Sequence, residues 1–420
     1  MSSLPALRVA GRLPTTAAFY LQVSILVTFL AGSSAPTPLY AVYQAEWGFS
    51  PITVTIVFGV YAVAVLAALL TVGSLSDYIG RRPVLIAALV LQAAAMIVFV
   101  TASGVPELLV ARVAQGLSTG AAVGALGAGI LDLDKVKGTI ANGVGPVLGT
   151  ATGAIGSGLL VQFLPAPTHL VYIVLFAVIV LQGIGVALMA ESSSPKPGAL
   201  ASLRPRFGMP QAVRRPLLVA IPALVAVWAL AGFYGSLGPT LVRLVVGSSS
   251  IVLGGLSLFI LAGGGGLTVL VLRNTAPRKV MFIGGVALFA GVGITLLGIG
   301  YTSTVLFFLG TAIAGVGFGG GFQGALRTVV PLAASHERAG VLSTLYVVSY
   351  LAMGLPAVVA GFVVVHGGGV TATSEGYGAA AMALAALALL GLARPERRQR
   401  PALAVCPALT DAEDSLARAS

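Results

Sequence analysis

Charged residues and cysteine are both scarce in this chain of 420 residues. Charged residues make up 8% of the sequence, whereas soluble globular domains carry about 25%. The only cysteine, Cys406, rules out an internal disulfide and a zinc site built from several cysteines. No polar segment carries a glycine-rich loop followed by the Lys and Ser or Thr of a phosphate-binding loop, so ATP drive is not supported. These shortages exclude a soluble monomer and a redox protein.

Long apolar runs take up most of the chain. Hydrophobic residues make up 57% of the sequence, and 55 further positions are glycine. A membrane-spanning helix needs roughly 20 apolar residues, and the runs are apolar on every face, which excludes an alternating outer-membrane barrel. Apolar runs occur at 17–41, 51–73, 83–103, 106–131, 138–163, 168–190, 216–242, 249–272, 279–299, 302–326, 338–366 and 376–393. The sequence therefore predicts an all-α membrane protein with twelve transmembrane helices.

Most basic residues lie in the segments expected on the cytoplasmic side of the membrane. With the N-terminus in the cytoplasm, all but two of the 23 Lys and Arg residues lie in cytoplasmic segments. The exceptions are Arg112, within the fourth span, and Arg243, at the outer end of the seventh. We therefore expect a multi-pass protein of the inner (plasma) membrane with both termini cytoplasmic, and the net charge of +11 gives no reason to expect nucleic-acid binding. The first run could mimic a secretory signal, but its length favours a retained span.

A polar linker divides the runs into six and six. It covers 191–215 and is rich in Ser, Pro and Arg. The predicted units are an N-terminal six-helix bundle over 1–190, this cytoplasmic central loop, a C-terminal six-helix bundle over 216–393 and a cytoplasmic tail over 394–420. A shift of 197 positions places Arg278 and Lys279 on Arg81 and Arg82. We therefore expect two pseudo-symmetric bundles with a substrate site between them near the bilayer midplane.

The loop between the second and third spans, GSLSDYIGRRPVLI, carries the most informative motif. Gly73 allows close helix approach, and Gly80 permits a tight reversal. Asp77 can pair with a cation or a helix N-terminus, and Arg81 and Arg82 face the anionic inner leaflet. The pattern resembles the signature loop of the major facilitator superfamily, which implies a conformational switch between two bundles. The alternative is a basic turn without a switching role.

The fourth span contains a buried-charge motif in the sequence ARVAQGLSTG. Arg112, Gln115 and Gly116 match the fourth-helix motif of the same superfamily. A guanidinium within a span is costly and normally faces the protein interior, a partner or a water-filled path. The resemblance implies a charge at the central cavity that senses protons or binds substrate. Because Arg112 lies near the outer end of the span, snorkelling to the interface is the alternative.

The fifth span, GVGPVLGTATGAIGSG, resembles the motif of the antiporter branch. Gly145, Gly149 and Gly153 recur every four residues and form a smooth strip for helix packing. Pro146 removes a backbone hydrogen bond and bends the helix. The resemblance favours export over uptake, although Thr150 replaces the second glycine of the pair that ends the family pattern.

Aromatic and small polar side chains near the middle of the spans are candidates for a substrate cavity. They could equally be ordinary bundle packing. The candidates are Tyr61, Trp228, Phe233, Tyr234, Tyr346, Ser349 and Tyr350.

The proton carrier is not evident. Proton-coupled carriers usually hold a carboxylate within a span, because burial brings its pKa into a range where it loads and unloads protons. None of the predicted spans has one in its interior. Asp77 is the best carboxylate candidate and Glu46 the next, while His169 and His366 lie near the outer surface. Facilitated diffusion therefore stays open.

The sequence predicts a secondary transporter of the drug/proton antiporter-like twelve-helix branch. We expect it to export small, mostly hydrophobic compounds in exchange for protons, as a monomer in the lipid bilayer and without a cofactor or metal. The alternative is uptake of a small metabolite by symport or facilitation. An intramembrane enzyme would need convergent catalytic groups at one depth, which the spans do not offer, and we expect no enzyme activity. A non-transporting membrane sensor is a further alternative.

Overall fold

The computed structural model describes residues 13–205, 207–334 and 337–393, and its regular elements are helices. Proline begins several of them, including Pro51, Pro167 and Pro277, at a position where its missing N–H costs nothing. We call the end where Arg81 and Arg338 begin their helices the basic end. The end where Trp47 and Val246 complete theirs is called the far end.

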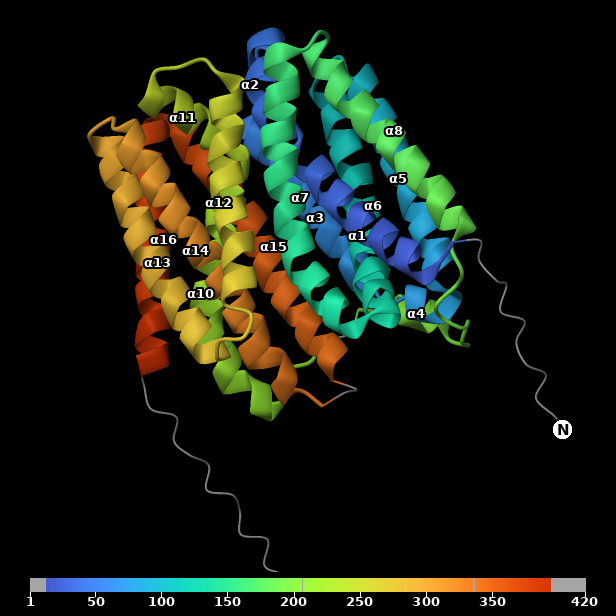
Figure 1. Cartoon of the computed structure of the whole chain (residues 1–420). Coiled ribbons are helices and arrows are strands. Elements are labelled where there is room, and N and C mark those ends of the chain that lie inside the picture. Colours follow the sequence, from blue (N-terminus) through green and yellow to red (C-terminus); the bar gives the residue numbers. More distant parts are fainter. Residues whose placement is uncertain (1–12, 206, 335–336, 394–420) are drawn as a thin grey trace, which may run out of the picture.

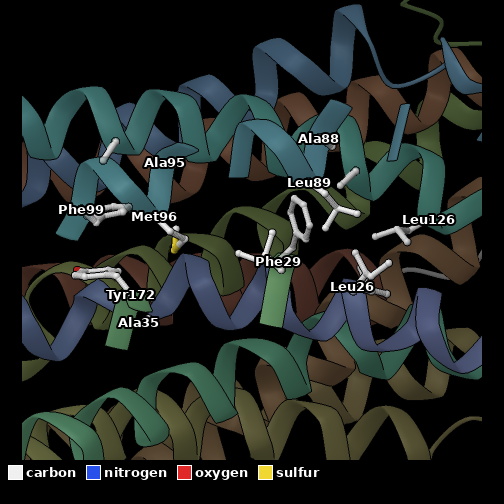
Figure 2. Packing of buried hydrophobic residues seen from close by; sticks show 14 of the residues in the cluster. Leu26, Phe29, Ala35, Ala88, Leu89, Ala95, Met96, Phe99, Leu126 and Tyr172 are labelled. Atoms are coloured by element: carbon white, nitrogen blue, oxygen red, sulfur yellow. The ribbon is translucent and has the colours of Figure 1, made fainter. Parts of the chain in front are cut away.

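Six spans form the N-terminal bundle, shown in blue to green in Figure 1. The first span is broken into two helices, α1 and α2. The elements are α1 (Thr15–Ser34), α2 (Pro36–Trp47), α3 (Pro51–Thr71), α4 (Ser76–Ile79), α5 (Arg81–Thr101), α6 (Val105–Leu133), α7 (Lys135–Phe163) and α8 (Pro167–Leu188). Figure 2 shows the core of this bundle, where Phe29 of α1, Met96 of α5 and Tyr172 of α8 are buried. Packing of these side chains fixes the relative positions of α1, α5 and α8.

The C-terminal bundle, yellow to red in Figure 1, repeats this plan. Its first span is also broken, between α10 and α11. The elements from the central segment onward are α9 (Ala199–Ser202), α10 (Gln211–Ser236), α11 (Gly238–Val246), α12 (Ile251–Val271), α13 (Pro277–Gly300), α14 (Thr304–Val329), the short 3-10 turn Val330–Leu332, α15 (Arg338–Val363), the π segment Val364–Gly368 and α16 (Gly369–Ala393). Helix α10 begins at Gln211, ahead of the expected start of its span at 216, and the predicted tail 394–420 lies outside the described residues.

The last two spans form one continuous helical stretch, Arg338–Ala393, of 56 residues, so length and composition alone distinguish eleven candidate spans in the described residues. At 1.5 Å per residue such a stretch is far longer than a bilayer core of about 30 Å. His366 and Gly367 have non-helical backbone angles, and the chain reverses there. Helix α16 returns along α10 and α13. Divided at this kink, the described part of the chain contains the predicted twelve spans.

Two seams join the bundles. In one, α3 packs on α15, and in the other, α7 packs on α12; Figure 1 shows α7 and α12 side by side. Each seam pairs the second span of one bundle with the fifth span of the other, as a pseudo-two-fold arrangement requires. Glycine allows the close approach in both, since a Cβ added at Gly255 would lie 2.4 Å from the Ala154 carbonyl oxygen and one at Gly59 2.9 Å from Val358.

Candidate functional site

The loop between the second and third spans forms a cluster of charges at the basic end. The loop folds into the single-turn helix α4, which carries Asp77. The Arg81 guanidinium donates to Asp77 Oδ1, to Ser76 Oγ at 2.8 Å and to Asp132 Oδ2 at 3.2 Å. The Arg81 side chain is 8% exposed and that of Asp77 50% exposed. Arg81 therefore joins α4 to the end of α6, while the Asp77 carboxylate stays open to solvent.

Glu191, in the central segment, caps the N-terminus of α5. Its Oε1 accepts from the Arg81 N–H at 2.8 Å and its Oε2 from the Arg82 N–H at 3.0 Å, which satisfies two of the donors that a helix leaves free at its start. Gly80 makes this approach possible, because its φ is 104° and an added Cβ would lie 2.6 Å from Glu191 Oε2. The Arg82 side chain donates to the Ala187 carbonyl. The sequence analysis missed the Glu191 cap, since no local pattern links it to α5.

The same loop contacts the central segment between the bundles. The Lys196 N–H donates to the Tyr78 carbonyl at 2.7 Å, and Ser74 Oγ donates to the Ser202 carbonyl at 3.2 Å. Gly73 packs on Gly124 of α6, where an added Cβ would lie 2.5 Å from the Gly73 carbonyl oxygen. The ion pairs found here join residues of the N-terminal bundle to one another. In this conformation the charge cluster holds α4, α5 and α6 together.

Arg112 lies inside the N-terminal bundle. Its side chain has no exposed surface. The guanidinium donates twice to the Tyr40 hydroxyl, once at 3.0 Å, and also to the Ser33 carbonyl at 2.9 Å and to Gln115 Oε1 at 2.7 Å. It also lies over the rings of Tyr40 and Tyr61, 5.6 and 5.0 Å from their centroids. The side chain therefore turns toward α1 and α2, and it does not extend to the far end of its span.

Two donors of α6 satisfy carbonyls at the break between α1 and α2. Pro36 has no N–H, so the Gly32 carbonyl loses its partner four residues ahead. Gln115 Nε2 donates to that carbonyl at 2.9 Å, and Arg112 donates to the next carbonyl, that of Ser33. Gly116 sits beside them against α3, where an added Cβ would lie 2.7 Å from the Tyr61 carbonyl oxygen. The fourth-helix motif thus stabilises a proline-broken helix, which explains why its polar groups lie within a span.

A second proline break is stabilised across the bundle interface. Pro239 follows the break between α10 and α11 and leaves the Gly235 carbonyl without its helical partner. Thr37 Oγ1 of α2 donates to this carbonyl at 3.0 Å, and Thr37 is 1% exposed. Ser250 Oγ of the C-terminal bundle donates to Gln162 Oε1 at 2.7 Å, also near the far end. These hydrogen bonds join the two bundles in the far half of the molecule.

The glycine strip of the fifth span packs inside its own bundle. An added Cβ at Gly149 would lie 2.5 Å from the Val27 carbonyl oxygen, and one at Gly153 would lie 2.2 Å from that of Ala31. An added Cβ at Gly145 would lie 3.0 Å from a side-chain methyl carbon of Leu26, so all three glycines of the strip face α1. Pro146 lies within α7, and Thr150 Oγ1 donates to the Pro146 carbonyl at 3.0 Å. The opposite face of α7 forms the seam with α12.

The predicted cavity residues separate into two groups. The ring centroids of Phe233 and Tyr377 lie 4.6 Å apart at an interplanar angle of 36°, and the Tyr234 hydroxyl lies 2.8 Å from Thr311 Oγ1, both inside the C-terminal bundle. They line a cavity of about 20 Å³, enough for about one water molecule. Ser349 is fully buried, and its hydroxyl has no hydrogen-bond partner in the described part of the chain.

Trp228 and Tyr350 lie at the bundle interface in an aromatic group. The Trp228 ring centroid is 5.6 Å from that of Tyr350, 5.3 Å from that of Phe322 and 6.3 Å from that of Phe318. Trp228 and Tyr350 also pack against a buried cluster formed by Phe58 and Ala62 of α3 and by Met353 and Ala357 of α15. Tyr346 lies one turn before Tyr350 on α15, and Tyr61 lies over Arg112 in the other bundle. The sequence analysis missed the two phenylalanines of α14, because Phe is too common in spans to stand out.

Twelve spans in two bundles, with paired proline breaks and a charged loop at one end, define a polytopic membrane transporter built from a repeated unit. Residues 23–289 match the model of the Major Facilitator Superfamily. The chain belongs to this superfamily.

Solved structures share the fold. A variant of the nucleoside transporter NupG is 14% identical with a TM-score of 0.70, over 90% of this chain and 100% of that one. Unmutated NupG is 15% identical with a TM-score of 0.66, over 89% of this chain and 98% of that one. The human organic anion transporter MFSD10 is 19% identical with a TM-score of 0.64, over 91% of this chain and 99% of that one. A search of curated protein sequences gave no match.

Proposed function

We propose that this protein moves small, mostly hydrophobic compounds across the inner membrane by alternating access, as a monomer with both termini in the cytoplasm. The observation that carries the proposal is the aromatic group around Trp228, which lies where the two bundles meet. Hydrogen bonds from Thr37 and Ser250 close the far half of the interface. The basic end would then face the cytoplasm, as positive charge at helix ends favours, and this conformation would be open to the inside.

Export in exchange for protons is the preferred direction, with the drug/proton antiporters as the expected branch. The support is the strip of Gly145, Gly149 and Gly153, which packs α7 tightly on α1 while the other face of α7 forms a seam with α12. A rigid pair of helices at this seam would limit leak while the bundles rock. Asp77 is the proposed proton carrier, because its carboxylate is half exposed at the basic end and forms an ion pair with Arg81.

Uptake by symport or facilitation is the second candidate. The only charged side chain among the mid-span groups described above is Arg112, and its hydrogen bonds go to neutral groups. Glu46 and Glu375 are exposed near the far end. A carrier without a carboxylate inside its spans has no need of a proton to release its substrate. Nucleoside and organic anion transporters share the fold, which keeps small polar metabolites open as cargo.

Vesicles containing the purified protein would separate these candidates. The vesicles would trap the pH dye pyranine, and a pH gradient would be imposed before quinoline is added as an uncharged aromatic probe. Antiport predicts a change of internal pH that depends on quinoline and on the protein, together with quinoline movement against the proton flux. Quinoline movement without a pH response would support facilitation.

Two controls accompany this experiment. Asp77→Asn removes the proposed proton carrier and tests the coupling to protons, and protein-free vesicles give the leak rate. Absence of protein-dependent quinoline movement in either direction would contradict the proposed transport of such compounds.

A further inference from the structure

The aromatic group contains three polar groups without partners. Trp228 Nε1 is buried and makes no hydrogen bond within the described part of the chain. The hydroxyls of Tyr346 and Tyr350 donate to and accept from no described residue either, and both side chains are only partly buried. An unpaired buried polar group costs about 1–3 kcal/mol. The buried Trp228 indole N–H therefore needs a partner that the described part of the chain does not supply, and the two tyrosine hydroxyls are further unpaired groups in the same aromatic group.

The three groups come together on two helices. Gly232 of α10 packs against the backbone of Met353 on α15, where an added Cβ would lie 2.1 Å from the Met353 carbonyl oxygen. Both helices run from the basic end to the far end, so Trp228, one turn before Gly232, lies level with Tyr350. Their ring centroids are 5.6 Å apart. Tyr346 extends the same face of α15 by one turn toward the basic end.

Aromatic rings supply the other walls. Phe322 and Phe318 of α14 meet the Trp228 ring edge-on, at interplanar angles of 84° and 72°. The buried cluster that contains Phe58 and Ala62 of α3 borders the group on the side of the other bundle. The side chains of Trp228, Phe318, Phe322, Tyr346 and Tyr350 are each only partly buried although they lie within spans. The surface that remains accessible is thus aromatic, with polar atoms at its edges.

Charge is missing from this group. Its members are Trp, Tyr and Phe, and the nearest buried cation described above, Arg112, lies beneath the Tyr61 ring and bonds to Tyr40, Ser33 and Gln115. An ionised ligand would lose its hydration here without gaining a counter-charge. A flat uncharged ring would stack on the aromatic faces, and an acceptor on its edge would satisfy the indole N–H or a tyrosine hydroxyl.

We propose that Trp228, Tyr346 and Tyr350 form a binding site for uncharged planar heteroaromatic compounds that carry a hydrogen-bond acceptor on the ring edge. This assignment rests on the proposed transport function and names its substrate class. Stacking on Phe318 and Phe322 provides most of the affinity, and the hydrogen bond selects heteroaromatic rings over hydrocarbons of the same shape.

The chain offers a built-in reporter for this site. It has two tryptophans, so Trp47→Phe leaves Trp228 as the sole one. Fluorescence of this variant in lipid nanodiscs is titrated with quinoline, with naphthalene, which has the same shape but no acceptor, and with the anion 2-naphthoate. One hydrogen bond of about 0.5–1.5 kcal/mol predicts that quinoline binds about 2- to 10-fold more tightly than naphthalene. The anion should bind more weakly than either.

Tyrosine variants test the assignment of the hydroxyls. Tyr346→Phe and Tyr350→Phe together should reduce the preference for quinoline without weakening naphthalene, because the rings stay. Tyr301→Phe is the matched control, since that side chain is 74% exposed at the far end. Trp228→Phe, measured by equilibrium dialysis of radiolabelled quinoline, should weaken binding by a similar factor.

Equal affinity for quinoline and naphthalene, tighter binding of 2-naphthoate, or no fluorescence response to any compound would each overturn the proposed substrate class. The measurement needs no gradient and no transport. If quinoline binds with the expected preference but does not move across the vesicle membrane, the proposed transport is overturned and the site stands. If quinoline is transported but binds without the expected preference, this site is overturned and the transport stands.

Discussion

The hydrogen bond from Thr37 to the Gly235 carbonyl should set the balance between the two conformations of the carrier. Thr37→Val keeps the shape of the side chain and removes its hydroxyl. In the present conformation the carbonyl freed by Pro239 then stays buried and unpaired, whereas water would reach it once the far end opens. Only the closed far end loses a contact. Buried hydrogen bonds contribute about 0.5–1.5 kcal/mol, with a mean near 0.6 inside membranes, so the population should shift about 2- to 10-fold.

Disulfide trapping measures this shift. Gln162 and Ser250 are hydrogen-bonded across the far half of the interface at 2.7 Å, so Gln162→Cys with Ser250→Cys, in a Cys406→Ser background, reports the closed far end. Thr37→Val should slow cross-linking about 2- to 10-fold, in proportion to the smaller population with a closed far end. Thr152→Val is the matched control, because the Thr152 hydroxyl bonds only to its own helix. Equal cross-linking rates in Thr37→Val and Thr152→Val would refute the view that the Thr37 hydrogen bond stabilises the closed far end.

Three further substitutions test the other clusters. Arg112→Ala removes four hydrogen bonds and leaves the Ser33 carbonyl unpaired, so we expect a loss of about 1–3 kcal/mol, seen as a lower Tm, and altered substrate or proton dependence; unchanged kinetics and Tm would contradict this. Gly153→Val places a side chain on the α1 backbone and should lower Tm and the folded yield, whereas Gly156→Val enters open space and should not; equal effects would refute the packing argument. Asp77→Asn breaks a half-exposed ion pair worth under about 1 kcal/mol, so membrane insertion should be normal while vesicle transport falls, and normal transport would exclude a switching role.

The spans themselves could be predicted because the bilayer imposes a length and a composition on each one. The predicted run at 51–73 corresponds to α3, which ends at Thr71, and the run at 279–299 corresponds to α13, Pro277–Gly300. The predicted ends of the spans differ more from the helix ends in the structure where the chain bends. The run 17–41 stops short of Trp47, because Pro36 and Pro38 interrupt the apolar pattern without ending the span. The last run begins earlier than expected, at Gly369, because polar residues of its first turns lie near the far end.

The motif residues were found from the sequence, but their contacts were not. Arg112 and Gln115 stand out as polar groups inside a span, and only packing of α6 on α1 shows that they repair a proline break. Glu191 has no local signature, since its partners at Arg81 and Arg82 are distant in the sequence. Phe318 and Phe322 are ordinary span residues until α10 brings Trp228 against them.

Local and bilayer forces thus explain what the sequence determined by itself, which is twelve apolar spans and their division into two sets of six. The tertiary structure alone decided which donor meets each freed carbonyl, which face of α7 packs on α1, and which rings surround Trp228. The physical reason is that an apolar run meets the requirement of the lipid on every face equally, so the choice of neighbour depends on the shape and polarity of side chains that only the packed bundle brings together.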